Sequence, residues 1–281
     1  MNSSSTQSLP GTSERFAFGK NWQRFLQVLN NDRIALAEES VRQLLQVQDL
    51  AGQRFLDIGS GSGLFSLAAR RLGADVVSFD YDPDSVACTL ELRRRFFPNQ
   101  DGWDVQQGSV LDDEFLKRLG QFDVVYSWGV LHHTGAMWDA FDKAAGLVAD
   151  NGQLAISIYN DQGGWSRRWL KIKRCYNALP ALLQPPFAAA VIGCCEFKYL
   201  MLETIRLRPW AYFRNIRDYS KQSLRGMSYW HDLVDWIGGY PFEVARPEDV
   251  FDFFRDRGFV LQKLTTMAGG HGCNEFVFQH R

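Results

Sequence analysis

The segment 57–63 has the residue types and the spacing of a nucleotide-binding turn. It reads Asp-Ile-Gly-Ser-Gly-Ser-Gly, follows the apolar segment 54–58, and runs into an amphipathic helical pattern that begins at Leu64. Glycines at such a strand-to-helix turn let a ligand approach the backbone closely. Nicotinamide dinucleotide sites carry G-x-G-x-x-G, which requires glycine at the position of Leu64. We therefore predict a nucleotide site of another kind, formed here by Asp57, Gly59, Ser60 and Gly61.

Asp80 is a second candidate for ligand binding, because it ends the next apolar segment, 75–79. In nucleotide-binding folds a carboxylate about 20 residues after the glycine turn accepts hydrogen bonds from the ribose hydroxyls. The alternative is that Asp80 and Asp82 only cap the helix that begins near Pro83. We assign the ribose to Asp80 and the helix cap to Asp82, since only Asp80 directly ends the strand. Tyr81 is placed against the adenine ring, with ordinary packing as the alternative.

Histidines further along the chain have the chemistry of a general base. His132 and His133 follow the apolar segment that ends near Ser127, and His231 stands beside Asp232 in an aromatic segment. Because histidine titrates near neutral pH, it can take a proton from a hydroxyl group during a reaction. The alternative for each of the first two is that it caps or packs against the next helix.

The order of apolar segments and helical patterns predicts an α/β protein with a parallel sheet, whose carboxyl edge would gather these residues. Strands are expected at 54–58, 75–79, 104–107, 122–127 and 153–159, and helices at 64–72, 84–97, 113–119 and 137–148. A last helix begins at Pro247 and ends before Gly258. Strands at 259–266 and 275–279 complete the pattern.

Together, the segment 57–63, Asp80 and the segment 126–134, which reads YSWGVLHHT, resemble class I S-adenosylmethionine-dependent methyltransferases. The segment 126–134 is similar to the motif after the fourth strand of small-molecule methyltransferases, including ubiquinone-biosynthesis O-methyltransferases and related bacterial methyltransferases. The resemblance implies a Rossmann-like, seven-stranded, mostly parallel sheet with an antiparallel C-terminal edge hairpin. The sequence itself adds a long, mainly helical insertion between the fifth strand and the last helix, roughly 160–246. We also expect an N-terminal helical lid over the cofactor, in which we place Phe18, Lys20 and Trp22.

The same resemblance implies S-adenosyl-L-methionine as the methyl donor and S-adenosyl-L-homocysteine as its product. Ser109 stands where many of these enzymes carry an aspartate that contacts the adenine amine, and a serine hydroxyl makes that contact more weakly. The backbone N–H of Val110 is expected near the adenine ring. Ser127 and Trp128 are expected along the methionine half of the donor, and Asp112 is expected to cap a helix.

These expectations divide the chain into five parts. They are a disordered tail with the start of the lid (1–20), N-terminal helices (21–50), an S-adenosylmethionine-binding core (51–159), a mainly helical substrate cap (160–246), and a C-terminal helix with the edge hairpin (247–281).

The substrate cap is basic in its first part and aromatic in its second. From Trp165 to Arg217 it carries ten Lys or Arg and two glutamates, although the whole chain has a formal net charge of −1. This asymmetry favours an anionic acceptor, such as a glycan intermediate, or a weak contact with a membrane surface. The alternative is a solvated face on helices that cover the active site. The segment 225–243 is expected to form a wall that faces the substrate.

Composition narrows the remaining choices. Five cysteines form no disulfide framework, and the N-terminus lacks the pattern of a signal peptide, so we expect a cytoplasmic protein with reduced thiols. A net charge near zero gives no general attraction to nucleic acid. The histidines lack helical i, i+4 spacing and no Cys-x-x-Cys occurs, so no metal site is expected. The sequence does not define an oligomeric state.

We therefore expect an S-adenosylmethionine-dependent methyltransferase that acts on a small molecule or a glycan intermediate at oxygen, by in-line displacement with a histidine base. N- or S-methylation is the alternative. A nicotinamide-dependent oxidoreductase, which Leu64 disfavours, and a non-catalytic nucleotide-binding module rank lower. Methylation of nucleic-acid bases is disfavoured, because no prolines follow Ser127 in its motif and no cysteine follows a proline.

Overall fold

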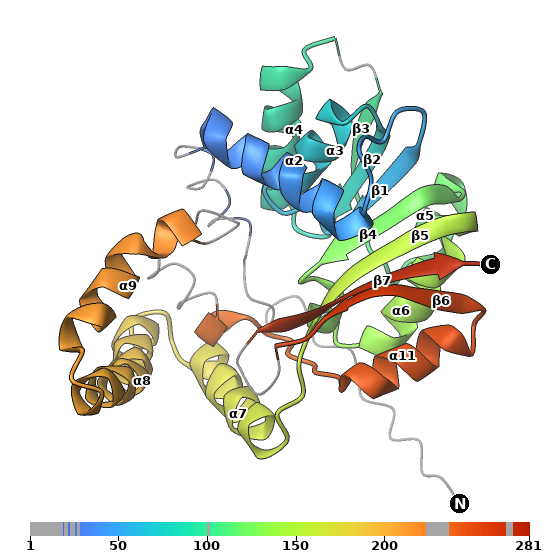
Figure 1. The fold of residues 1–281 in the computed structure, drawn as a ribbon. Coiled ribbons are helices and arrows are strands. Elements are labelled where there is room, and N and C mark those ends of the chain that lie inside the picture. Colours follow the sequence, from blue (N-terminus) through green and yellow to red (C-terminus); the bar gives the residue numbers. More distant parts are fainter. Residues whose placement is uncertain are drawn as a thin grey trace, which may run out of the picture.

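A seven-stranded sheet forms the centre of the protein (Figure 1). The computed structural model describes residues 19, 22, 26, 29–99, 102–222, 236–267 and 272–281. The strands are β1 (Arg54–Ile58), β2 (Asp75–Asp80), β3 (Trp103–Gln107), β4 (Phe122–Trp128), β5 (Val148–Tyr159), β6 (Phe259–Thr265) and β7 (Cys273–His280). Their spatial order is β3-β2-β1-β4-β5-β7-β6, with β7 antiparallel to both of its neighbours. The predicted mostly parallel sheet with an antiparallel C-terminal hairpin is confirmed.

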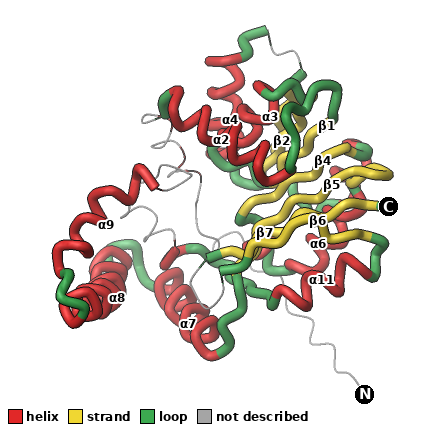
Figure 2. Tube along the Cα trace, in the orientation of Figure 1, coloured by secondary structure: helices red, strands yellow, loops and turns green. Residues whose placement is uncertain are grey.

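Helices cover both faces of this sheet (Figure 2). Successive strand residues point to opposite faces, so Phe55 packs in one core layer and Leu56 in the other. The layer that contains Phe55 includes residues of α2 (Asn31–Leu45), α3 (Leu64–Arg71) and α4 (Pro83–Phe96). The layer that contains Leu56 includes residues of α5 (Asp113–Leu119), α6 (Met137–Gly146) and α11 (Pro247–Arg255).

Most predicted element boundaries agree with the structure to within one or two residues, and β5 is the main difference. It begins at Val148 instead of residue 153, because Val148 pairs with Phe122 before the register shifts and pairing resumes at Gln153. The helix caps follow the prediction. Asp82 caps α4 by accepting a hydrogen bond from the Asp84 N–H, and Asp112 caps α5 in the same way.

The insertion after β5 is helical and lies beyond the carboxyl edge of the sheet (Figure 1). It contains α7 (Gly164–Ala178), α8 (Gln184–Ile205) and α9 (Pro209–Gln222). After it the chain returns to the sheet, where the Ala245 N–H donates to the Tyr159 carbonyl and Asn160 forms a parallel bridge with Ala245. The end of the insertion is therefore tied to the end of β5.

Candidate functional site

The glycine turn between β1 and α3 is held by the end of the neighbouring strand. The N–H groups of Gly59 and Ser60 both donate to the Phe79 carbonyl, at 2.8 and 3.1 Å. Gly59 has φ = +76°, which favours glycine, and a Cβ at this position would lie 2.4 Å from a methyl group of Val130. The missing side chain therefore lets the loop after β4 pack directly on the turn.

Asp80 lies at the end of β2, directly against the same turn. One carboxylate oxygen accepts from the Gly61 N–H and the other from the Asp82 N–H, both at 2.9 Å. Burial raises the pKa of Asp80 to about 6, because its effect is larger than that of the hydrogen bonds, which lower the pKa. Tyr81, the next residue, has 47% of its surface exposed. The structure thus brings the predicted carboxylate and the predicted glycine turn together.

Asp57 lies beneath the turn, in the interior. It accepts a hydrogen bond of 2.5 Å from the Ser66 hydroxyl, which in turn accepts from Ser78, and Ser78 accepts from the Trp103 indole N–H. Burial raises the pKa of Asp57 to about 7. This chain of polar groups fastens the first turn of α3 to the sheet. The sequence analysis did not identify it, because isolated serines in a strand and a helix carry no spacing signal.

Residues from the N-terminal part of the chain lie over the turn. The indole ring of Trp22 would be 3.1 Å from a Cβ placed on Gly61, and the Gly19 N–H donates to Asp82 at 2.9 Å. This is where a lid over a bound nucleoside would lie. Phe18 and Lys20, which we also assigned to the lid, lie outside the described residues.

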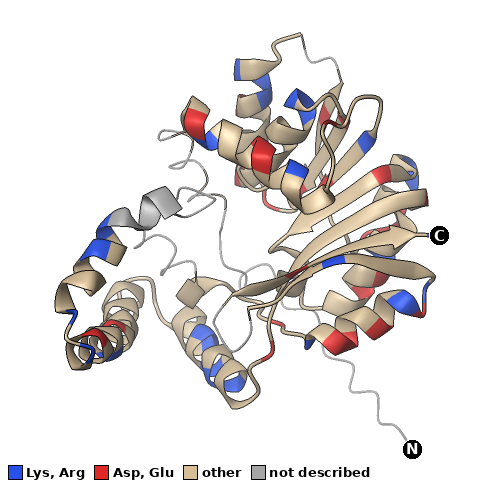
Figure 3. Cartoon of the chain, viewed as in Figure 1, with Lys and Arg blue, Asp and Glu red and all other residues tan. Residues whose placement is uncertain are grey.

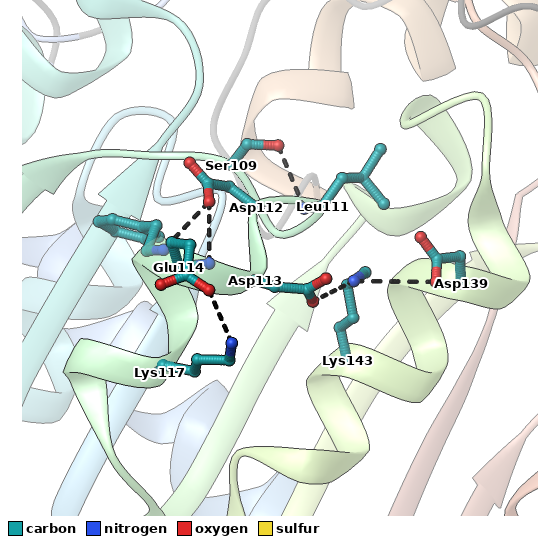
Figure 4. A network of polar contacts seen from close by, with 9 residues as sticks. Ser109, Leu111, Asp112, Asp113, Glu114, Lys117, Asp139 and Lys143 are labelled. Carbon is teal, nitrogen blue, oxygen red and sulfur yellow. Dashed lines mark hydrogen bonds and ion pairs between the residues drawn. The ribbon is translucent and has the colours of Figure 1, made fainter.

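The loop after β3 contains the two residues that were assigned to the adenine. The Ser109 hydroxyl accepts a hydrogen bond from the Leu111 N–H at 3.1 Å, and the side chain of Val110 is buried (Figure 4). Asp112 follows and caps α5, and Lys143 of α6 forms an ion pair with Asp113 (Figure 4). The Gly108 N–H donates to the Asp80 carbonyl at 3.0 Å, so the loop lies beside the end of β2.

Ser127 and Trp128 end β4, next to β1. The buried Ser127 hydroxyl donates to the Ile58 carbonyl at 3.1 Å, so it ties the end of β4 to the start of the glycine turn. Trp128 is half-buried and stacks on Tyr126, with ring centroids 5.9 Å apart. Both residues therefore lie at the carboxyl edge of the sheet, where α/β proteins bind ligands.

The two predicted histidines form a short 3₁₀ helix, Leu131–His133, immediately after β4. His133 is half-buried, and its Nδ1 lies 2.5 Å from the Pro241 carbonyl oxygen. A carbonyl only accepts, so Nδ1 carries the hydrogen and the lone pair of the neutral ring is on Nε2. His132 is fully buried, with its ring centroid 3.9 Å from that of Tyr159. The geometry therefore favours His133 over His132 for proton transfer.

The segment 236–246 packs on this histidine loop. The Glu243 N–H donates to the His132 carbonyl, and the Glu243 carboxylate accepts from the Met137 N–H at the start of α6. Burial raises the pKa of Glu243. The part of the predicted wall that the structure describes therefore lies beside the histidines. His231, the third candidate base, lies outside the described residues.

Lys173 differs from the other basic residues of the insertion. Nine of the ten are exposed, but Lys173 is fully buried, where its ammonium group donates to the Trp236 carbonyl. Its Nζ also lies 4.7 Å from the ring centroid of Trp236 and 4.8 Å from that of Phe242. By its position in the sequence Lys173 is expected on the basic face, whereas in the structure it links α7 to the segment that touches the histidines.

Two further findings concern metals and membranes. Across the part of the chain that the structure describes, no three His, Cys, Asp or Glu side chains gather as a metal-binding group. Within the same residues, no helix has both the length and the apolar composition that crossing a bilayer requires.

Solved structures share this fold. The magnesium protoporphyrin IX methyltransferase of Synechocystis PCC 6803, crystallised with bound SAH, has a TM-score of 0.53 at 15% identity, covering 93% of this chain and 95% of that one. The N-methyltransferase NodS of Bradyrhizobium japonicum, in complex with S-adenosyl-L-homocysteine, has a TM-score of 0.50 at 13% identity, covering 94% and 99%. The fold is that of S-adenosylmethionine-dependent methyltransferases. The family model described as "Methyltransferase domain" matches residues 24–227, and the chain belongs to this family.

The names of two curated relatives indicate different acceptors. A tRNA U34 carboxymethyltransferase of Pseudomonas savastanoi is 25% identical over 182 residues, which cover 61% of this chain and 56% of that protein. A ubiquinone biosynthesis O-methyltransferase of Xanthomonas oryzae is 33% identical over 112 residues, which cover 40% and 45%. The chain thus spans about half the length of the curated relatives that it matches.

Proposed function

We propose that the protein is an S-adenosylmethionine-dependent methyltransferase that methylates a hydroxyl oxygen of a small molecule or a glycan intermediate. The observation that carries the proposal is the contact between Gly59 and Val130. This contact connects the loop that ends in His133 with the turn that would bind the methyl donor. Membership in the methyltransferase domain family supports the donor.

The turn suits a nucleoside donor that has no phosphate. The N–H groups of Gly59, Ser60 and Gly61 already donate to protein oxygens, so the turn does not present the amide donors that a pyrophosphate needs. It would instead offer close backbone approach, while Asp80 accepts the ribose hydroxyls. Tyr81, Ser109 and Val110 would surround the adenine. Trp128 would lie along the methionine half, with Ser127 and Asp57 supporting the site from below.

His133 is the proposed base, with His132 and His231 as the other candidates. When bound, S-adenosylmethionine supplies an activated methyl group on a positively charged sulfur. His133 Nε2 would take the proton of the acceptor hydroxyl as the hydroxyl oxygen receives the methyl group. The hydrogen bond to Pro241 holds the ring in the tautomer that this step needs. Such proton transfer typically contributes a factor of ~10²–10⁴ in rate.

The acceptor would lie between the histidines and the insertion. The rings of Tyr159, Trp236 and Phe242 pack together beside them, at centroid distances of 5.0 and 5.3 Å from Tyr159. Such rings can pack against an aromatic ring or a sugar face. Exposed Lys and Arg on α7, which starts five residues after Tyr159, would attract a carboxylate or phosphate on the acceptor (Figure 3). These features support an anionic acceptor.

A transfer assay with methyl-labelled S-adenosylmethionine tests the proposal. Matched panels of phenolic acids and acidic sugars would be offered as hydroxyl, amine and thiol forms, with bulk tRNA as a separate sample. We expect label on a hydroxyl compound, and His133→Ala should lose most of it while still binding S-adenosyl-L-homocysteine. Preferential labelling of the amine or thiol forms would replace O-methylation with the alternative chemistry. Labelling of tRNA alone would refute a small-molecule acceptor.

A further inference from the structure

The turn between α8 and α9 lies on the side of the insertion away from the sheet (Figure 1). It carries large apolar side chains that are exposed to solvent. Leu207 is 80% exposed, Ile205 72% and Trp210 66%. Isolated apolar side chains are common on protein surfaces, but a group of three such large ones within six residues indicates an interaction surface. We call residues 205–210 the α8–α9 turn.

The backbone of this turn is ordered by its own hydrogen bonds. The Leu207 N–H donates to the Thr204 carbonyl at 2.9 Å, and the Arg208 N–H donates to the Glu203 carbonyl at 2.8 Å. Leu207 has φ = +58°, a conformation uncommon for leucine, and Pro209 starts α9 directly afterwards. The apolar side chains are thus held outward by a defined turn.

The two helices that carry the turn are joined by a polar contact. The Tyr212 hydroxyl donates to the Glu196 carboxylate at 2.7 Å, and Glu196 is buried between them. Burial and this hydrogen bond raise the pKa of Tyr212 to about 12, so the hydroxyl keeps its proton and the contact persists at neutral pH. The α8–α9 turn therefore projects from the insertion as the end of a helical hairpin.

Basic side chains alternate with the apolar ones. Arg206 and Arg208 flank Leu207, all three are exposed, and Arg214 is exposed one turn further along α9 (Figure 3). Segments that lie on an anionic bilayer typically combine apolar side chains and tryptophan with Lys or Arg. A second copy of the chain fits less well, because a two-fold contact through this turn would place like charges together.

We propose that the α8–α9 turn docks on the surface of an anionic lipid bilayer. Ile205, Leu207 and Trp210 enter the headgroup region, while Arg208 contacts lipid phosphates. Arg206 lies beside it and forms an ion pair with Glu203 at 2.8 Å. The attachment is reversible, since it depends on three apolar side chains and few charges. This inference does not depend on the proposed reaction.

Co-sedimentation of the full chain with vesicles tests the inference. The probes are vesicles of phosphatidylcholine with half phosphatidylglycerol, and vesicles of phosphatidylcholine alone. We expect binding to the first that is at least ~10-fold tighter than to the second and that weakens with added salt. Leu207→Asp and Arg208→Glu should each lower binding by ~10-fold or more.

Leu182→Asp is the matched control, because Leu182 is 86% exposed but precedes the other end of α8. It should leave vesicle binding unchanged, and all variants should keep the thermal unfolding and S-adenosyl-L-homocysteine binding of the parent. Equal loss in Leu182→Asp would overturn the assignment to this turn. Failure of the parent protein to sediment with either vesicle would overturn the inference. It would also be overturned if the parent binds no vesicles but forms a dimer in solution that Leu207→Asp converts to a monomer.

Discussion

His133 and Pro241, which are 108 positions apart in the chain, are joined by a hydrogen bond of 2.5 Å from the imidazole Nδ1 to the backbone carbonyl. Pro241 belongs to the end of the insertion, which the Ala245 N–H ties to β5. The orientation of the proposed base is therefore set by the segment in which we also place part of the proposed acceptor wall. Acceptor recognition and proton transfer should depend on the same residues.

Replacing His133 by alanine should lower kcat by ~10²–10⁴, because the acceptor hydroxyl loses the group that takes its proton. Steady-state rates at saturating acceptor and S-adenosylmethionine measure this effect. His280→Ala is the control, since His280 stacks on Phe259 at the far edge of the sheet. Equal rates for the parent and His133→Ala would exclude this base.

The affinity for S-adenosyl-L-homocysteine should fall as the pH is lowered through 6. Asp80 must be ionised to accept both ribose hydroxyls, and its pKa in the ligand-free protein is raised from 3.8 to about 6. Below that pKa the affinity should fall by up to ~10-fold per pH unit, and above it the affinity should level off. Calorimetric titrations from pH 5 to 8 measure this profile. Asp80→Asn should bind weakly and without the inflection near 6. A pH-independent affinity in the parent would refute the role of Asp80.

Gly59→Ala should damage both folding and donor binding. Its Cβ would lie 2.4 Å from Val130, and its φ of +76° is strained for alanine. Gly52 has φ = +77° with nothing within 4 Å, so Gly52→Ala measures the strain alone, roughly 1–2 kcal/mol. We expect Gly59→Ala to lose more free energy of unfolding than Gly52→Ala and also to lose S-adenosyl-L-homocysteine affinity. If the two variants behave alike, the contact with Val130 has no role.

Lys173→Ala should destabilise the insertion by about 2–4 kcal/mol, because it leaves a cavity beneath the rings and removes the donor to the Trp236 carbonyl. Lys171→Ala, an exposed neighbour on α7, should change stability by less than about 0.5 kcal/mol. Denaturant unfolding compares them. Lys173→Ala should also raise the KM for the acceptor, since Trp236 packs on Tyr159. Equal stability of the two variants would show that Lys173 is not an anchor.

The donor side of the site was predictable from sequence because it depends on the order of neighbouring strands and helices along the chain. A parallel sheet places the carboxyl ends of adjacent strands together, so the glycine turn after β1 and Asp80 at the end of β2 had to meet. The caps at Asp82 and Asp112 were predictable for the same reason, since each acts on the next few residues. The early start of β5 was missed because Val148 pairs with Phe122 across a register shift that no periodicity indicates.

The acceptor side was predictable in composition but not in arrangement. The hydrogen bond from His133 to Pro241 and the burial of Lys173 against Trp236 both join residues more than 60 positions apart. A sequence shows that Lys173 is charged, and an isolated charge on a helix is expected at the surface. Its burial depends on a segment that returns to α7 after α8 and α9, and a local sequence pattern does not indicate this return.

Titration of the purified protein with S-adenosyl-L-homocysteine and with NADH tests the central claim most directly. We predict saturable calorimetric binding of S-adenosyl-L-homocysteine and none of NADH. Asp80→Ala should lose at least ~100-fold in affinity for S-adenosyl-L-homocysteine, as expected for two hydrogen bonds to a charged group. Tight binding of NADH without binding of S-adenosyl-L-homocysteine would contradict the claim, and so would unchanged affinity in Asp80→Ala.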